Sequence, residues 1–352
     1  MKNIAFVVLT FLLLLVGSVF VLEASVAESF TTFGDQYFLF KQHLVGVGVG
    51  LIAYLAGMLI PPRLWVKFGA GLYIFGLILL TAVFIPGLGR ELNGASRWIN
   101  VAGFGFQSVE FFKFGLIAFY AQWMSKHQKL RVFLASLAVP ILLIMLQPDL
   151  GSLLLVISIA CSVFFVAGGN IKQLGLLAAV GIPLVLIAIL ASPYRRDRLL
   201  TFLNPESDPL GTSFHIRQIT IALGRGGWFG QGLGNSTQKF AYIPEASTDS
   251  IFAIIAEELG YLGSTIIIVS LFGYMLLGYQ LIKTHEDPGV RLLGLGLITW
   301  LGVQMLLNLA SVVGLVPLTG VPLPFFSYGR SAVIMVLLAA GIITRIGKAP
   351  ST

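Results

Sequence analysis

Long apolar runs separated by shorter polar segments dominate the sequence. A helix that crosses the ~30 Å hydrocarbon core of a bilayer needs about 20 mostly apolar residues. Ten runs meet or approach this length, and we predict a membrane-spanning helix in each: residues 4–22, 43–60, 68–86, 111–124, 132–146, 150–167, 174–191, 262–282, 292–311 and 331–346. The run 251–255 is too short to span a bilayer by itself.

The first run has an alternative interpretation, a secretory signal peptide. Lys2 precedes it, and Ser25, Val26 and Ala27 resemble a small-residue cleavage site. Its apolar core, residues 4–22, is longer than the roughly 7–15 residues of a signal-peptide core. We therefore predict an uncleaved first span.

Composition agrees with these spans. Of the 352 residues, 57% are apolar and 11% are charged, whereas soluble domains average about 45–50% and about 25%. This excludes a soluble enzyme, a disordered regulator and a fibrous protein. We predict an all-α polytopic membrane protein, with one integral membrane domain over residues 1–352. Cys161 is the single cysteine, so no intramolecular disulfide or thiolate metal cluster can form.

Basic residues are concentrated in the short loops between the predicted spans. With the N-terminus inside, the inner segments carry Lys2, Arg63, Lys67, Lys126, Lys129, Arg131, Lys172, Lys283, Arg291, Arg345 and Lys348. This density predicts that both termini are cytoplasmic. The net charge of +7 then reflects membrane orientation and not nucleic-acid binding. The long loops 23–42, 87–110, 192–261 and 312–330 are predicted to be extracytoplasmic, the largest between spans 7 and 8.

Four segments carry residues that could do chemistry, and each lies in or beside a polar connection. The sequence contains no P-loop motif, so direct ATP-driven chemistry is excluded. The first segment, 147–151, joins two spans. We predict that Asp149 caps the helix that follows, and a polar site is the alternative.

The second segment is the long loop 192–261. It opens with Arg195, Arg196 and Arg198, and six glycines follow within residues 224–234. Backbone N–H groups of a glycine-rich turn can converge on an anion such as phosphate. The alternatives are an ordinary tight or flexible turn for the glycines and contacts with lipid headgroups for the arginines.

The third segment holds four carboxylates in a chain with few charges: Glu245, Asp249, Glu257 and Glu258. If a helix starts at Asp249, Glu257 lies eight residues further on and shares roughly the same face. A partly desolvated carboxylate with acidic neighbours has a raised pKa, which suits a general base. We favour this role for Asp249 over helix capping. The cluster could also bind a divalent cation, Mg²⁺ or Mn²⁺.

The fourth segment, residues 317–330, contains three prolines and two glycines and cannot form a continuous helix. Irregular backbone at membrane depth persists only where protein or a wet cavity satisfies its polar groups. We predict that this segment lines or covers a site, with Arg330 as a candidate anion ligand. The alternative is a re-entrant structural plug.

In these segments the sequence resembles the SEDS family (shape, elongation, division and sporulation), which contains FtsW, RodA and SpoVE. The matching motifs keep the family order over residues 96–329: 96–99 with 106–107 and Glu110, 147–151, 202–205 with 208–211, 226–234, 244–245 with 248–249, 257–260, and 318–325 with 327–329. Residues 232–236 and 238–239 are more similar to the FtsW/SpoVE branch than to RodA. The sequence departs from the family pattern at three places: Ser250 replaces Phe, 108–109 replaces Pro-Ser, and 330–332 replaces Gly-Ser-Ser.

The resemblance implies a peptidoglycan glycosyltransferase that polymerises lipid II, an undecaprenyl-pyrophosphate-linked precursor, at the outer face of the bacterial cytoplasmic membrane. It implies that Asp249 is the general base, with Glu245 and Glu257 as further catalytic candidates. The candidates for substrate binding are Arg97, Gln107, Glu110, Asp149, Arg195, Arg198, Arg225, Lys239, Pro322 and Ser327. No tightly bound cofactor is implied.

The resemblance also implies partners, namely a class B penicillin-binding protein and other membrane proteins of the division or elongation machinery. Two alternative functions are a lipid II flippase and a non-catalytic scaffold for a transpeptidase. A flippase needs a polar pathway to the cytoplasmic leaflet, whereas the candidate residues lie at the predicted outer ends of the spans. This distribution favours catalysis.

Overall fold

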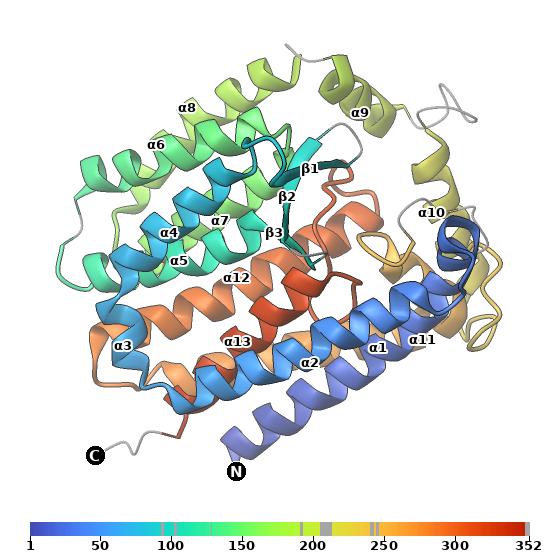
Figure 1. Cartoon of the computed structure of the whole chain (residues 1–352), viewed down its shortest axis with the longest axis horizontal. Coiled ribbons are helices and arrows are strands. Elements are labelled where there is room, and N and C mark those ends of the chain that lie inside the picture. The colour runs from blue at the N-terminus through green and yellow to red at the C-terminus, as the bar shows by residue number, and fades with distance from the viewer. Residues whose placement is uncertain are drawn as a thin grey trace.

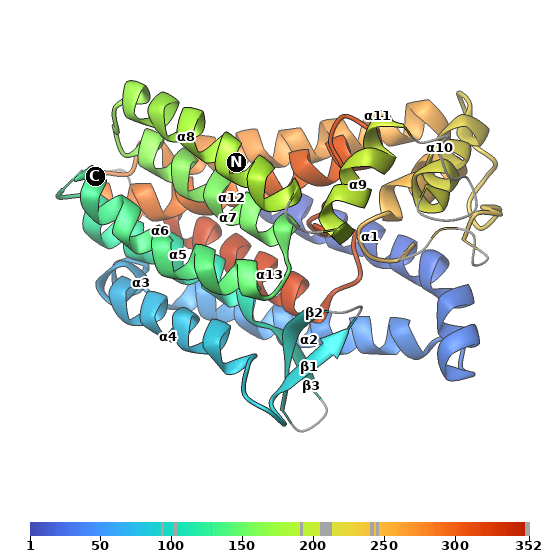
Figure 2. The same cartoon turned by 90° about the horizontal axis from the view of Figure 1, so that it is seen from above.

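The computed structural model describes residues 1–92, 95–101, 104–127, 129–190, 193–204, 213–239, 243 and 246–348. The described helices form a bundle (Figure 1): α1 (Lys2–Phe33), α2 (Phe38–Leu59), α3 (Pro62–Lys67), α4 (Gly69–Ala82), α5 (Ser108–Met124), α6 (Leu130–Leu146), α7 (Leu150–Val166), α8 (Ile171–Leu190), α9 (Pro193–Leu203), α10 (Phe214–Gly226), α11 (Ile251–Ile282), α12 (Pro288–Val312) and α13 (Arg330–Ile346). Both termini lie toward the end of the bundle that carries α3, and α9 and α10 lie at the opposite end (Figures 1 and 2).

Each of the ten predicted spans falls on a helix, namely α1, α2, α4–α8 and α11–α13. Among the described helices, α1, α2, α11 and α12 are long and apolar enough to cross a membrane, and α4, α6 and α7 are apolar but shorter. Large apolar side chains are exposed along these helices, as expected where lipid is the solvent. The chain is therefore an all-α multi-pass membrane protein, and the number of spans stays a prediction.

The prediction of a long loop over residues 23–42 is wrong. Helix α1 continues well past the predicted span, because small residues such as Ala24 and Ser29 are buried against the rest of the protein. The helix ends at Gly34, which adopts a left-handed conformation with φ 72°. The Gly34 N–H donates to the carbonyl of Phe30 at 3.0 Å, which is a common way to terminate a helix.

The predicted loop 192–261 contains more helix than the sequence indicated. Helices α9 and α10 lie within it, and α11 begins at Ile251 and not at residue 262. The apolar run 251–255 is thus the first turn of a long helix. That helix has a break at Gly260, with φ 68° and ψ −169°. A side chain at Gly260 would collide with the backbone of Gly230, so the glycine-rich turn packs directly into the break.

The predicted loop 87–110 contains a three-stranded antiparallel sheet that the sequence analysis did not anticipate. Its strands are β1 (Gly89–Leu92), β2 (Ala95–Val101) and β3 (Phe104–Gln107), in the order β1-β2-β3. Trp98 on β2 pairs with Gln107 on β3. Strand β3 leads directly into α5, so the sheet covers one end of the bundle beside α13 (Figure 2).

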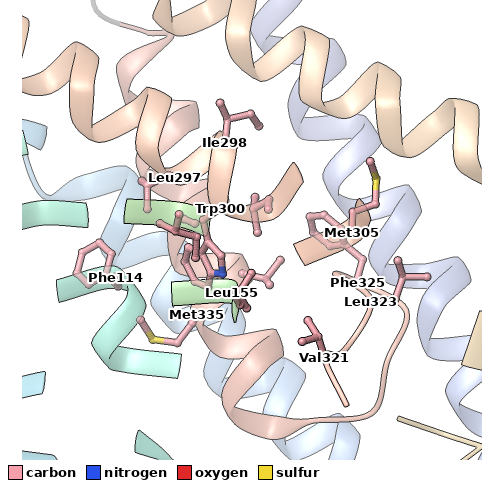
Figure 3. Packing of buried hydrophobic residues seen from close by; sticks show 14 of the residues in the cluster. Phe114, Leu155, Leu297, Ile298, Trp300, Met305, Val321, Leu323, Phe325 and Met335 are labelled. Atoms are coloured by element: carbon pink, nitrogen blue, oxygen red, sulfur yellow. The ribbon is translucent and has the colours of Figure 1, made fainter. Parts of the chain in front are cut away.

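The buried core is centred on α5, α12 and α13, whose residues are largely shielded from the surroundings. The irregular segment between α12 and α13 enters this core. Figure 3 shows Val321, Leu323 and Phe325 of that segment in the same apolar cluster as Trp300 and Met305 of α12. The prolines and glycines of this segment therefore shape an irregular path whose apolar residues Val321, Leu323 and Phe325 are buried, while Gly320 is exposed.

Candidate active site

The segment from Leu318 to Leu323, which we call the central segment, is where the four candidate regions meet. Two side-chain amides of α12 hold its backbone: Gln304 Nε2 donates to the carbonyl of Pro322 at 2.9 Å, and Asn308 Nδ2 donates to the carbonyl of Val321 at 2.8 Å. From α9, Arg198 Nη1 donates to the carbonyl of Leu318 at 3.4 Å. Neighbouring helices thereby satisfy backbone carbonyls of a segment that has no regular secondary structure of its own.

Asp249 lies against the central segment, and its residue is 8% exposed. The Cβ position of Gly320 is 3.8 Å from Asp249 Oδ2, so the segment passes directly beside the carboxylate. Asn308 Nδ2 also donates to the Asp249 carbonyl at 2.7 Å. One amide therefore ties the Asp249 backbone to the central segment. Ser250, and not Asp249, occupies the N-cap position of α11.

Asp149 and Arg97 form a second polar group beside the same segment. Asp149 caps α7 as predicted, because its carboxylate accepts from the backbone N–H of Ser152 at 3.0 Å and from the hydroxyl of that serine at 2.7 Å. Arg97 Nε lies 3.5 Å from Asp149 Oδ2, and Arg97 Nη2 donates to the carbonyl of Pro148 at 2.8 Å. The backbone of Gly151 packs directly on the carbonyl of Thr319 in the central segment.

Glu110 belongs to a buried ion pair behind the central segment. Lys113 Nζ donates to Glu110 Oε1 at 2.7 Å and to Gln304 Oε1 at 2.9 Å. The Lys113 ammonium also lies 4.9 Å from the ring centroid of Trp300, which itself donates to Gln304 Oε1. The pair is almost completely shielded, and Lys113 and Gln304 connect Glu110 to the backbone of the central segment.

Glu257 is placed differently from its predicted position beside Asp249. Its buried carboxylate accepts from the hydroxyl of Ser236 and the backbone N–H groups of Thr237 and Gln238, and it lies 3.4 Å from Arg225 Nε. The helical periodicity assumed from Asp249 does not apply, because α11 begins only at Ile251. We therefore interpret Glu257 and Arg225 as groups that hold the loop.

Lys239 has a similar role next to Glu257. Its ammonium lies 2.9 Å from Glu23 Oε2 on α1 and 3.2 Å from Glu258 Oε1 on α11. It also donates to the carbonyl of Gly234 at 2.8 Å. Within the part of the chain that the structure describes, no group of three His, Cys, Asp or Glu side chains could hold a metal ion. A divalent cation at this acidic cluster stays a prediction.

The glycine-rich turn forms backbone hydrogen bonds within the protein. Gly230 N–H donates to the carbonyl of Gly226, Gln231 N–H to that of Glu257, and Gly232 N–H to that of Glu258. These N–H groups are therefore occupied by protein carbonyls. The alternative interpretation, a tightly packed turn, is correct for this part of the segment, and the phosphate cradle is not.

The other candidates have diverse positions. Gln107 N–H donates to Ser331 Oγ of α13 at 2.9 Å, and Ser327 Oγ accepts from the backbone N–H of Leu323 at 2.7 Å, which closes the turn after the central segment. Pro322 contributes its carbonyl, as described above. Glu245 and the side chain of Arg195 lie outside the described residues. Arg330 donates to Gln42 of α2 at 2.8 Å.

Sequence reasoning missed four residues of this site: Lys113, Gln304, Asn308 and His215. The first three are polar residues inside predicted spans, and that position alone is a signal of a functional or structural role. His215 lies on α10, and its Nε2 is 2.8 Å from Ser250 Oγ. Burial, together with the charge of Arg198, lowers the pKa of His215 to about 4. The histidine is therefore neutral near pH 7.

The family model described as cell cycle protein FtsW/RodA/SpoVE matches residues 4–351. Stage V sporulation protein E of Bacillus subtilis is 36% identical over 98% of this chain and 97% of its own length. The probable peptidoglycan glycosyltransferase FtsW of Halorhodospira halophila is 37% identical over 95% of this chain and 87% of its own.

Solved structures of related proteins have the same fold as this chain. One chain of a peptidoglycan synthase complex that coordinates polymerization and crosslinking superposes with a TM-score of 0.80, at 27% identity over 98% of this chain and 97% of that chain. Rod shape determining protein RodA of Thermus thermophilus shares the fold, with a TM-score of 0.73 at 23% identity over 99% and 97% of the two chains. The chain therefore belongs to the FtsW/RodA/SpoVE family of cell cycle proteins.

Proposed function

We propose that this chain is a peptidoglycan glycosyltransferase that polymerises lipid II, with Asp249 as the general base, in cell division or cell-shape maintenance. The observation that carries the proposal is the placement of Asp249: a buried carboxylate lies against an irregular segment that also receives an arginine from α9. The names of the FtsW relatives support the same activity.

In the proposed reaction, the Asp249 carboxylate accepts the proton of the acceptor sugar 4-hydroxyl as that oxygen attacks the donor anomeric carbon. The bond from this carbon to the lipid pyrophosphate breaks, and undecaprenyl pyrophosphate leaves with the bonding electron pair. General-base catalysis contributes roughly 10²–10⁴-fold. Positioning of the two sugars and stabilisation of the leaving charge supply the rest. The donor is already activated, so no ATP is consumed.

Arg198 is the cation that we assign to the pyrophosphate. A guanidinium binds phosphate oxygens through paired N–H groups. Arg198 is exposed and contacts Leu318, two residues before the glycine that flanks Asp249. Arg97, in contrast, is held by Asp149 and the Pro148 carbonyl. We propose that Arg97 and Asp149 position the segment, and that Arg198 contacts substrate.

We further propose that the site faces the outside of the bacterial cytoplasmic membrane, with both termini in the cytoplasm. The density of basic residues in the short loops supports this orientation. In the structure, the termini lie at the end of the bundle opposite α9 and α10 (Figure 1). We propose a class B penicillin-binding protein as partner, since a structural relative is part of a peptidoglycan synthase complex.

The test is polymerisation of labelled lipid II by the purified chain with its cognate penicillin-binding protein, whose transpeptidase is blocked. Asp249→Asn keeps the size of the side chain and removes the base, so polymer should fall by at least about 100-fold. Asp35→Asn is the matched control, because Asp35 is an exposed acid whose carboxylate contacts Lys41 and the backbone N–H of Tyr37, away from the central segment. Full polymer from a folded Asp249→Asn variant would remove Asp249 as the base. Movement of lipid II across liposomes without polymer would establish a flippase instead.

A further inference from the structure

The N-cap of α11 uses its side chain in an unusual way. Serine is among the preferred N-cap residues, because its hydroxyl oxygen accepts from a backbone N–H in the first turn of the helix. Ser250 occupies that position but makes no side-chain capping bond. Its hydroxyl forms a hydrogen bond with His215 Nε2 of α10, at 2.8 Å. The Ser250 hydroxyl therefore bonds to the neighbouring helix α10 and does not cap its own helix.

This bond lies one residue from the proposed base. Asn308 of α12 holds the carbonyl of Asp249 at 2.7 Å, and His215 of α10 holds the side chain of Ser250. Two consecutive residues are therefore fixed by side chains from two different helices. Ser250 is fully buried, so removal of its partner leaves a desolvated hydroxyl, which costs more than the bond itself contributes.

Helix α10 is attached to α11 at a second point. At the other end of α10, Gly226 packs on the carbonyl of Ala256 so closely that a Cβ would collide with it. The contact at Gly226 sets the distance between the helices, and the bond from His215 to Ser250 fixes the first residue of α11. The histidine side chain has few rotatable bonds and a planar ring. Its hydrogen bond to Ser250 therefore fixes the start of α11 relative to the start of α10.

The charge state of His215 suits this role. Arg198 lies near enough to influence His215, and the first turn of α11 presents the positive end of a helix dipole. A second positive charge here would repel Arg198. A neutral imidazole can still form the bond to Ser250, whichever nitrogen carries the proton.

We propose that His215 and Ser250 are a positioning pair that sets the place of the Asp249 carboxylate against the central segment. The pair forms no bond with substrate and exchanges no proton with it. It acts on turnover through the position of the base and leaves substrate affinity unchanged. The inference rests on the proposed function, in which Asp249 is the base, and it deepens that function by adding the residues that hold the base.

The first test is a double-mutant cycle in the lipid II polymerisation assay with the complete synthase complex. Ser250→Ala and His215→Leu should each lower kcat by about three- to tenfold, the effect of one hydrogen bond, with KM within twofold of wild type. The double variant should be no slower than the slower single variant. His215→Gln retains a hydrogen-bonding side chain and should recover part of the loss.

Ser264→Ala is the matched control. Ser264 is a buried serine on the same helix, and its hydroxyl has no partner within the described part of the chain. This variant should keep wild-type kcat and KM. Wild-type turnover in Ser250→Ala, independent additive losses in the double variant, or losses confined to KM would each overturn the positioning pair.

A second measurement, amide hydrogen exchange, does not depend on activity. Peptides covering residues 246–256 should exchange faster in Ser250→Ala and in His215→Leu than in wild type, and at the wild-type rate in Ser264→Ala. Unchanged exchange in both pair variants would refute the pair whatever the enzyme does. If the wild-type complex makes no polymer while exchange responds as expected, the proposed function fails and the structural link between α10 and α11 stands.

Discussion

Gly151 offers a direct test of whether the central segment positions the base. It is the second residue of α7, and a Cβ at this position would overlap the carbonyl oxygen of Thr319. The obstacle is backbone, so no side chain can rotate away. The start of α7 is also held from outside the helix, because Arg97 of β2 contacts the Asp149 carboxylate and donates to the Pro148 carbonyl. Gly151→Ala should therefore displace the central segment.

The size of the effect follows from the geometry. Relief of the overlap requires the Thr319 carbonyl to move by roughly 1 Å, and a misplacement of about 1 Å can cost about 100-fold in rate. Gly320, the next residue, is the one whose Cβ position lies 3.8 Å from the Asp249 carboxylate. We therefore expect kcat/KM for lipid II polymerisation to fall by about 100-fold, which corresponds to ~2.7 kcal/mol of transition-state stabilisation.

The loss should be much larger in activity than in stability. Alanine is favoured over glycine within a helix by up to about 1 kcal/mol, which offsets part of the ~1–3 kcal/mol cost of overpacking. The thermal unfolding midpoint should change by a few degrees only. Gly175→Ala in α8 is the matched control, since a Cβ there meets nothing within 4 Å. Activity of Gly151→Ala within twofold of this control would show that the central segment does not position the base.

Three further predictions concern the residues around that segment. Lys113→Met leaves the buried Glu110 carboxylate unpaired and should lower the unfolding free energy by about 3–5 kcal/mol. The double variant Lys113→Met, Glu110→Gln should regain most of that stability. Thermal unfolding measures both variants, and a double variant as unstable as Lys113→Met would contradict the reasoning. Asn308→Leu removes both bonds to the backbone and should reduce polymerisation more than it reduces thermal stability; equal losses would indicate a structural role alone. The pKa of His215 is about 4, below the 6.5 of an unperturbed histidine, so the unfolded chain takes up a proton first as pH falls and stability is lost. Between pH 7 and pH 5 wild type should lose about 2 kcal/mol more than His215→Gln, and identical pH slopes would refute this.

The sequence was sufficient for the parts of the fold that depend on long apolar runs. Each predicted span coincides with a helix, and Asp149 caps α7 because Asp before an apolar run is a local signal. The sheet at residues 89–107 was missed, since its strands are short and were included in a predicted loop. The extension of α1 was missed because its last turns are polar on one side, which a search for apolar runs cannot detect.

Part of the candidate site could also be predicted from the sequence, and part could not. The four candidate regions could be recognised locally, but their convergence on the central segment depends on tertiary packing. Glu257 was misplaced because the helical period was extended back through Asp249, where the chain is not yet helical. Gln304 and Asn308 could have been recognised as amides inside an apolar run. The link from His215 to Ser250 joins residues 35 apart on two elements and leaves no local pattern.

The two amides on α12 have a consequence for how this protein can vary. Gln304 and Asn308 are one helical turn apart, and they bind the carbonyls of Pro322 and Val321, which are adjacent. A shift of the chain by one residue along α12 would leave both amides facing the wrong backbone groups. The two bonds therefore fix which residues of the central segment lie opposite Gln304 and Asn308, as backbone hydrogen bonds fix the register of two paired strands. We therefore expect insertions and deletions between α12 and α13 to occur before Leu318, in residues 313–317. The central segment beside Asp249 should keep its length.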